Sequence, residues 1–263
     1  MGMDPVPGGA TVRTASPTTA VPAAAGARVR DRLTGPLRAV EVVHRGRDAV
    51  YLDESGWALG VVTGRATRVP CALALAARGP ELDLARVQRA EVGGGEVRLH
   101  LPDRVLAVRV ARLVDTTVPP LRSLPDARVL ALLSEHARPA LEELGPEVVH
   151  DAAGRPERVL GLGSGLTPLG DDVVAGWAAA SYALGTPVAG ADPRGATTLL
   201  SATLVDCARR GEVLPELREL VRTLAGTPIR EDAADRAARD LAAVGHTSGT
   251  GLLLGVYLRL EGR

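Results

Sequence analysis

The chain contains no Lys, no Asn and no Phe, and aromatic residues make up only 2% of its 263 residues. All 31 basic side chains are therefore Arg, a bias that points to a GC-rich genome and to no particular site. The missing Lys excludes a P-loop, which needs a Lys after its second Gly. Because 46% of the residues are hydrophobic and so few are aromatic, a globular core has to be built from Leu, Val and Ala.

Net charge, cysteine and long apolar runs are also scarce. The formal net charge is zero, which disfavours nucleic acid and anionic membranes as partners. Cys71 and Cys207 have neither the spacing of a metal site nor that of a disulfide framework. No apolar stretch approaches the roughly 18 residues of a membrane span, and the N-terminus lacks a signal-peptide pattern. We therefore expect a cytoplasmic protein with buried thiols.

The residue pattern predicts an α+β protein in three parts. Residues 1–27 hold hardly any large apolar side chain and are expected to be a disordered tail. Residues 28–117 show short alternating runs divided by Gly, Asp and Pro, which predict an antiparallel β-domain of about six strands. Residues 118–263 have the period of helices. The predicted strands are 37–43, 48–52, 57–62, 87–92, 96–101 and 105–113, and 71–78 is interpreted as a short helix.

Capping residues and glycines set the predicted helix ends in the second part. Asp126 opens the first helix, Gly145 ends it, and Pro139 is expected to kink or divide it. A glycine also follows most of the other helices, as expected of a C-terminal cap. The predicted helices are 126–144, 168–184, 197–210, 215–224, 230–244 and 248–260.

The stretch Gly161–Gly176 reads Gly-Leu-Gly-Ser-Gly-Leu-Thr-Pro-Leu-Gly-Asp-Asp-Val-Val-Ala-Gly. Its glycines let the backbone approach a ligand closely, and Thr167 and Pro168 predict a helix start as N-cap and first helical residue. A dinucleotide loop is excluded because Leu166 stands at the position of its third Gly. Since a helix N-terminus attracts anions, we predict a phosphate or carboxylate site. Its residues are Gly163, Ser164, Gly165, Thr167 and Gly170.

Two acids, Asp171 and Asp172, fall in the first turn of that helix, where they either stabilise the helix end or belong to the ligand site. The adjoining glycine loop favours the second interpretation. Neighbouring helical residues point about 100° apart, so the two acids face different directions. Asp172 heads the small face that continues through Gly176, and we expect that face to pack on Gly251 and Gly255 of the last helix.

A second glycine segment, Gly245–Gly249, contains His246, Thr247 and Ser248. We predict that Thr247, Ser248 and Gly249 complete the anion site, and that His246 comes close to Asp172. Taken alone, His246 is interpreted more readily as a residue that interacts with the end of the preceding helix. Ser201 either points its hydroxyl at this site or bonds to the previous helical turn.

Three segments, 161–176, 197–212 and 245–258, resemble the bacterial AllH-like family, catalogued as a domain of unknown function. One branch of this family is a subunit of the oxamate carbamoyltransferase of anaerobic allantoin breakdown. The resemblance implies a transferase subunit in purine catabolism that works with other protein subunits. It also implies a small carboxylate or carbamoyl phosphate as ligand, and it raises the case for His246 as a ligand-site residue.

Two hypotheses of function follow. In the first, the chain takes part in carbamoyl transfer, with Asp172, Asp171 and His246 as catalytic candidates. A phosphate about 4 Å from an ionised carboxylate is repelled by about 4 kcal/mol at an effective dielectric of about 20. Either an Mg²⁺ held by Asp172 bridges the two, or the acids meet the amide end of the substrate. In the second hypothesis the chain is a noncatalytic binding or scaffold subunit.

Overall fold

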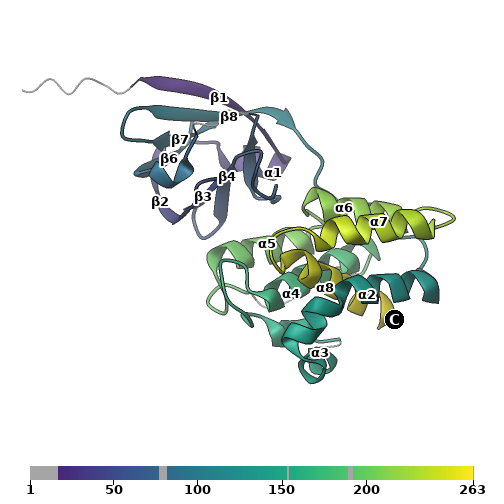
Figure 1. Cartoon of the computed structure of the whole chain (residues 1–263). Helices are drawn as coiled ribbons and strands as arrows, with labels where there is room; N and C mark the ends of the chain where they lie inside the picture. Colours follow the sequence, from purple (N-terminus) through teal and green to yellow (C-terminus); the bar gives the residue numbers. More distant parts are fainter. Residues whose placement is uncertain (1–16, 77–81, 153, 189–191, 263) are drawn as a thin grey trace, which may run out of the picture.

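The computed structural model describes residues 17–76, 82–152, 154–188 and 192–262, which form a β-barrel followed by a group of helices (Figure 1). The predicted α+β class is therefore confirmed. The strands are β1 (Thr18–Ala25), β2 (Arg38–Arg45), β3 (Ala49–Asp53), β4 (Ala58–Val62), β5 (Ala72–Leu75), β6 (Arg89–Gly93), β7 (Glu96–His100) and β8 (Val105–Leu113). The helices are α1 (Ala27–Arg32), α2 (Ala127–Leu144), α3 (Pro146–Ala152), α4 (Leu169–Ala183), α5 (Leu199–Arg209), α6 (Pro215–Leu224), α7 (Glu231–Ala242) and α8 (Ser248–Glu261), with short 3-10 turns at Leu84–Arg86 and Pro156–Val159.

The barrel closes in the order β1-β5-β4-β3-β2-β6-β7-β8, with β1 paired to β8. Most neighbours are antiparallel, as predicted, but β1 with β8 and β4 with β5 are parallel, so the barrel is mixed. The prediction of a short helix at 71–78 was wrong, because Ala72–Leu75 forms β5 between β1 and β4. Short-range periodicity cannot indicate such pairing between distant segments.

The expectation of a disordered tail over residues 1–27 was wrong for Thr18–Ala25, which forms β1 along β8. The sequence of β1 consists of Thr, Ala, Val and Pro, which carry little hydrophobic signal, yet Ala23 and Ala25 are buried in the barrel. Residues 1–16 lie outside the described part of the chain. Because its side chains are small, the sequence of β1 gives no strand signal, and the strand is stabilised by its pairing with β8.

Capping predicted several helix ends correctly. Asp126 caps α2 by accepting hydrogen bonds from two backbone N–H groups, and α6 spans Pro215–Leu224 as expected. Pro139 lies inside α2 without dividing it. The helix after the glycine loop begins at Leu169, and Pro168, not Thr167, is its N-cap residue. The Thr167 hydroxyl is used elsewhere, in a hydrogen bond with Ser248.

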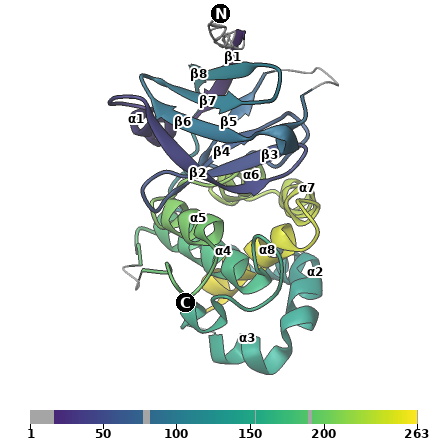
Figure 2. The same cartoon turned by 90° about the vertical axis from the view of Figure 1, so that its left-hand side faces the viewer.

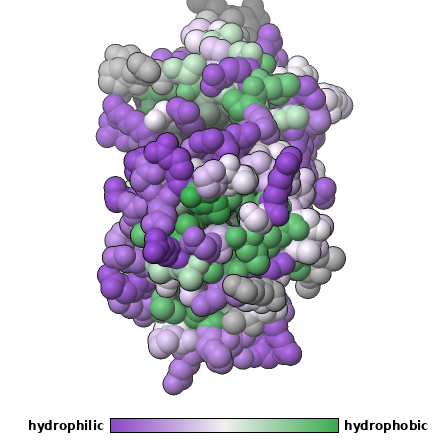
Figure 3. Space-filling view, turned by 90° about the vertical axis from the view of Figure 1, so that its right-hand side faces the viewer, coloured by the Kyte–Doolittle hydropathy of each residue, from purple (hydrophilic) through white to green (hydrophobic). Residues whose placement is uncertain are grey.

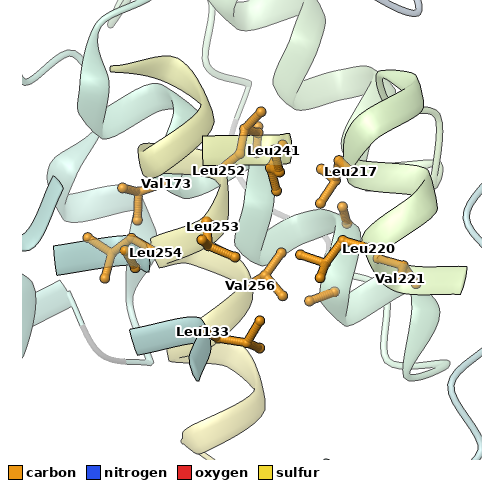
Figure 4. Packing of buried hydrophobic residues seen from close by; sticks show 14 of the residues in the cluster. Leu133, Val173, Leu217, Leu220, Val221, Leu241, Leu252, Leu253, Leu254 and Val256 are labelled. Atoms are coloured by element: carbon orange, nitrogen blue, oxygen red, sulfur yellow. The ribbon is translucent and has the colours of Figure 1, made fainter. Parts of the chain in front are cut away.

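Buried hydrophobic side chains form one cluster in the barrel and one among the helices, part of which Figure 4 shows. Helices α5, α6 and α7 lie on the side of the helical group that faces the barrel (Figure 2), and α5 contributes Leu200 and Cys207 to the barrel cluster. The connection to the helices is held by backbone hydrogen bonds from Val118 to Gly211 and from Val213 to Thr116. We propose two structural units, 28–117 and 118–263, with β1 added to the first.

Helices α4 and α8 pack closely through glycines. A Cβ atom at Gly176 would lie 2.0 Å from the carbonyl oxygen of Leu252, and one at Gly255 would lie 2.0 Å from that of Val173. At Gly251 it would lie 2.9 Å from Cβ of Asp172. The predicted packing of two small faces is therefore confirmed, and it brings the start of α8 against the start of α4.

Candidate functional site

A cavity of about 640 Å³ lies between the barrel and the helices. Both glycine segments border it, through residues 164–167 and 245–248, although about 80 residues of sequence separate them. The barrel contributes Tyr51, Thr67, Val69 and Pro70 to the opposite part of its wall. The two motifs therefore meet at one cavity, as the sequence predicted.

The glycine loop before α4 is fastened at three points. The carboxylate of Asp171 accepts a hydrogen bond of 2.6 Å from the backbone N–H of Gly161. The hydroxyl of Thr198 donates to the carbonyl of Leu166 at 2.8 Å. The hydroxyls of Thr167 and Ser248 lie 3.1 Å apart, which joins the loop to the start of α8. These bonds fasten the loop although five of its residues, 162–166, are exposed.

Several backbone N–H groups of the glycine loop make no hydrogen bond within the described structure. None of the N–H groups from Gly163 to Thr167 donates to another described residue. Gly163 and Gly165 have positive φ angles of 111° and 95°, a conformation that favours glycine. Successive unpaired N–H groups beside a helix N-terminus are the arrangement that binds phosphate and carboxylate groups.

Asp172 is a buried acid on the cavity wall, only 5% exposed. Burial raises its pKa to about 8, the charge of Asp171 adds to that shift, and a hydrogen bond with Ser248 opposes it. Its Oδ2 atom has no hydrogen-bond partner among the described residues. At neutral pH this side chain is therefore a mainly uncharged carboxyl group with an unused oxygen, a combination that often marks a functional site.

Asp171 has a different place. It is 2% exposed, does not line the cavity, and accepts hydrogen bonds from the Gly161 N–H and the Thr197 hydroxyl. Its carboxylate therefore ties the glycine loop to the segment before α5. This geometry separates the two neighbouring acids: Asp171 holds the loop, and Asp172 faces the cavity.

The other predicted site residues divide in the same way. His246, Thr247, Ser248, Ser164, Gly165 and Thr167 line the cavity. Three glycines and one serine of the predicted set do not line it: Gly163, Gly170, Gly249 and Ser201.

The glycines that do not line the cavity lie where backbones approach closely. A Cβ atom at Gly170 would lie 1.8 Å from the carbonyl oxygen of Val159, and one at Gly249 would lie 1.9 Å from that of Leu241. At Gly163 it would lie 2.8 Å from the backbone nitrogen of Leu169. These glycines therefore allow the close packing that shapes the site. Sequence alone could not separate them from the glycines that border the cavity.

No arginine lines this cavity in the described part of the chain, and its charged residues besides Asp172 are Glu143 and Glu212. Two of the arginines near the motifs in sequence are engaged elsewhere: Arg158 with Asp151, and Arg230 with Asp232. Nor do the described residues include a group of three His, Cys, Asp or Glu side chains that could hold a metal ion. An anion in this cavity would therefore be bound by backbone N–H groups and hydroxyls.

Sequence reasoning missed the apolar part of the wall and the barrel's share in it. No local pattern indicates these residues, because they meet only when the barrel docks on the helices. The missed residues include Tyr51, Val69, Leu200, Leu204, Leu214, Leu217 and Leu252.

Comparison with known proteins supports the resemblance seen in the sequence. In the described part of the chain, no helix is both long and apolar enough to cross a membrane. No curated protein and no solved structure matches the chain. A protein-family model does match: residues 159–260, the segment that holds both glycine motifs, correspond to the family described as oxamate carbamoyltransferase subunit AllH.

Proposed function

We propose that the chain is an AllH-like subunit of a carbamoyltransferase-type complex and that its glycine-lined cavity binds a small carboxylate or amide such as oxamate. The matching family is described as a subunit of oxamate carbamoyltransferase. One observation carries the proposal for the site: unpaired loop N–H groups and the unpaired Oδ2 of Asp172 border the same cavity. Hydrogen-bond donors for an anion and the Asp172 carboxyl group, which could bind an amide, thus border the same cavity.

The chemistry would be transfer of a carbamoyl group from carbamoyl phosphate. The amide nitrogen of the acceptor attacks the carbonyl carbon, and a new C–N bond forms. The C–O bond to phosphate breaks, phosphate leaves with the electron pair, and the nitrogen loses a proton. In this proposal the N–H groups of residues 163–167 and the hydroxyls of Ser164 and Thr167 hold the phosphate, whose charge grows as it leaves.

Asp172 suits this reaction because its carboxyl group is mainly uncharged at neutral pH. An ionised carboxylate about 4 Å from a phosphate would cost about 4 kcal/mol at an effective dielectric of about 20. A neutral carboxyl group avoids that repulsion and is able to donate a hydrogen bond to a carbonyl oxygen. His246 is the candidate acceptor for the amide proton. An Mg²⁺ held at Asp172 is the other way to offset the repulsion.

The proposal is tested by measuring phosphate release from carbamoyl phosphate with oxamate present. The purified chain is assayed alone and together with the products of neighbouring genes. Replacing Gly165 by Val should weaken carbamoyl phosphate binding by about tenfold or more, since a β-branched residue resists a φ of 95°. Gly185→Val is the matched control: Gly185 also has positive φ and open space around it, but it lies at the other end of α4. Equal binding by the two variants would contradict the proposed site.

A noncatalytic metabolite-binding or scaffold subunit is the alternative. It is favoured by the absence of an arginine from the described cavity wall and by the exposed side chains of Leu162 and Leu166 on the loop itself. Figure 3 shows further hydrophobic surface near the middle of one face, between hydrophilic regions. Exposed apolar patches often mark protein interfaces. In this case the chain would bind the ligand or its partners, and the Asp172→Asn variant would leave the rate of phosphate release by the complex unchanged.

A further inference from the structure

A second cavity, of about 350 Å³, lies on the other side of α5 and shares no lining residue with the glycine-lined cavity. Leu200, Leu204 and Ala208 of α5 face the first cavity, at the spacing of one helix face. The same helix contributes Thr203 and Asp206 to the second. The barrel part of the chain contributes Arg32 of α1 and residues 55–57 of the turn between β3 and β4 to the second cavity.

The turn between β3 and β4 presents Trp57 to this cavity. Ser55 and Gly56 both have positive φ angles, and Glu54 and Trp57 exchange two backbone hydrogen bonds, as in a two-residue hairpin turn. Trp57 follows directly and is 5% exposed. Its indole N–H is buried and donates to no described residue. An indole nitrogen acts only as a donor, so this group lacks an acceptor.

Three arginines line the same cavity. The guanidinium of Arg32 lies 4.3 Å from the centre of the Trp57 ring, and Arg32 lines the cavity. Arg194 reaches the turn from the loop before α5: its Nη1 atom would lie 3.2 Å from a Cβ atom at Gly56. Arg209 of α5 also lines the cavity. Guanidinium groups with a fixed fork of donors are suited to phosphate and carboxylate oxygens.

The charges at this cavity favour an anion. Its described lining holds the three arginines named above and two acids, Asp192 and Asp206. Arg32 is also ion-paired with the buried Glu54, which does not line the cavity and which contacts Arg38 as well, so this cluster has two arginines for one acid. Asp206 is already paired with Arg28 and Arg210, neither of which lines the cavity. Asp192 pairs with Arg194 on the surface, where such a pair is weak and gives way to a competing anion.

We propose that this second cavity binds a small anion of the phosphate or carboxylate type, held by Arg32 and Arg194 and by the indole N–H of Trp57. The volume of the cavity is at the lower end of the range for small-molecule sites, so a ligand that carries a phosphate or carboxylate group fits within it. This site is separate from the proposed carbamoyl phosphate site and does not depend on it. The helix α5 lies between the two.

Trp57 provides the test, because the chain contains only two tryptophans. In a Trp177→Phe variant of the full chain, Trp57 is the sole fluorescent indole. Inorganic phosphate and, separately, acetate are titrated at constant ionic strength against sodium chloride. We expect a saturable change in fluorescence with one or both anions and none with chloride. The anion with the tighter saturation identifies whether phosphate or carboxylate is preferred.

Three further variants give the result its meaning. Arg194→Ala should weaken binding by about tenfold or more, whereas Arg122→Ala, which removes an exposed arginine outside the cavity, should not. Gly165→Val should leave this binding unchanged, because the glycine loop is not part of the site. Calorimetry on the unmodified chain repeats the measurement if Trp177→Phe does not fold. The proposal is overturned if the fluorescence response is linear or is the same with chloride. It is also overturned if Arg122→Ala weakens binding as much as Arg194→Ala does, or if Gly165→Val abolishes binding.

Discussion

The barrel and the helical half both bury acidic side chains, but they neutralise them differently. In the barrel, Glu54 and Glu96 are 5% and 2% exposed, and each contacts two arginines. Those of Glu96 are Arg98 and Arg109, both at 2.6 Å. In the helical half, Asp171 and Asp172 are as deeply buried, yet no arginine contacts either side chain in the described structure.

The difference indicates different uses. A buried acid that has two ion-pair partners is fully engaged in the fold, and removing its partners is costly. Asp171 resembles these acids, because N–H and hydroxyl donors occupy both of its oxygens. Asp172 alone retains a buried oxygen without a partner and a raised pKa at a cavity. A buried group of this kind beside a cavity is a candidate for contact with a ligand.

The largest expected effect comes from separating α4 and α8, because their close approach is what buries Asp172. In a Gly255→Val variant the new Cβ atom would lie 2.0 Å from the Val173 carbonyl oxygen. This oxygen belongs to the backbone, so it cannot rotate away as the end of a flexible side chain could. We expect the free energy of unfolding to fall by about 3 kcal/mol or more, measured by urea denaturation. Gly64→Ala, with open space around it, is the control and should change stability little. A loss below about 1 kcal/mol would contradict this packing.

The next effect concerns the pH dependence produced by Asp172. Its carboxyl group has a pKa near 3.8 when unfolded and about 8 when folded. Between these values the folded chain retains a proton that the unfolded chain has lost, so stability falls as pH rises from about 4 to about 8. The slope from this group approaches about 1.4 kcal/mol per pH unit and ends above pH 8. Asp172→Asn should remove it, as seen in the difference between variant and wild-type unfolding curves.

Asp171→Asn is the matched variant for that experiment. It should keep a slope due to Asp172, but the slope should end at a lower pH, because the charge of Asp171 contributes to the raised pKa of Asp172. It should also lower stability by about 1–3 kcal/mol, because an amide places its NH₂ group against a donor. The same pair of variants tests the site. Asp172→Asn should reduce the rate of phosphate release in the proposed reaction by more than the fall in the fraction of folded protein accounts for. Identical pH profiles for the two variants would show that the acids are equivalent, against the geometry described above.

The sequence predicted the helical half well because its signals are local. Asp126 and Gly145 bound α2 as expected, and the small residues at Gly176 and Gly255 correctly indicated which faces of α4 and α8 meet. The distinction between Asp171 and Asp172 also followed from their directions on the helix. Helix ends and the direction of each side chain depend on residues within a few turns of one another, which a sequence pattern records directly, and a face of small residues on each helix shows which faces can pack closely.

Features that depend on distant contacts were beyond the sequence. The strand β1 is identifiable only by its pairing with β8, more than 80 residues later. The cavity wall formed by Tyr51 and Val69 depends on how the barrel docks against α5, and so does the position of Gly56 beside Arg194. The hydrogen bonds of Asp171 to Gly161 and Thr197 likewise require the folded loop. Composition and hydrophobic periodicity do not predict these long-range contacts.

The smallest expected effect is at Glu96, and it has the opposite sign to that of Asp172. Burial acts to raise the pKa of Glu96, but the hydrogen bonds and charges of Arg98 and Arg109 lower it overall below 4.5. Its ion pairs therefore stabilise the fold above the unfolded pKa, and this contribution is lost as pH falls through the folded pKa. Because both arginines are more than 40% exposed, the stabilisation by these ion pairs is screened and should stay below about 1 kcal/mol.

This stabilisation is measured as the difference in free energy of unfolding between wild type and Glu96→Gln from pH 3 to pH 6, and 1 M salt should reduce that difference. A difference that grows on acidification would mean that this barrel acid, like Asp172, is held mainly by its proton, and the contrast between the two regions would fail.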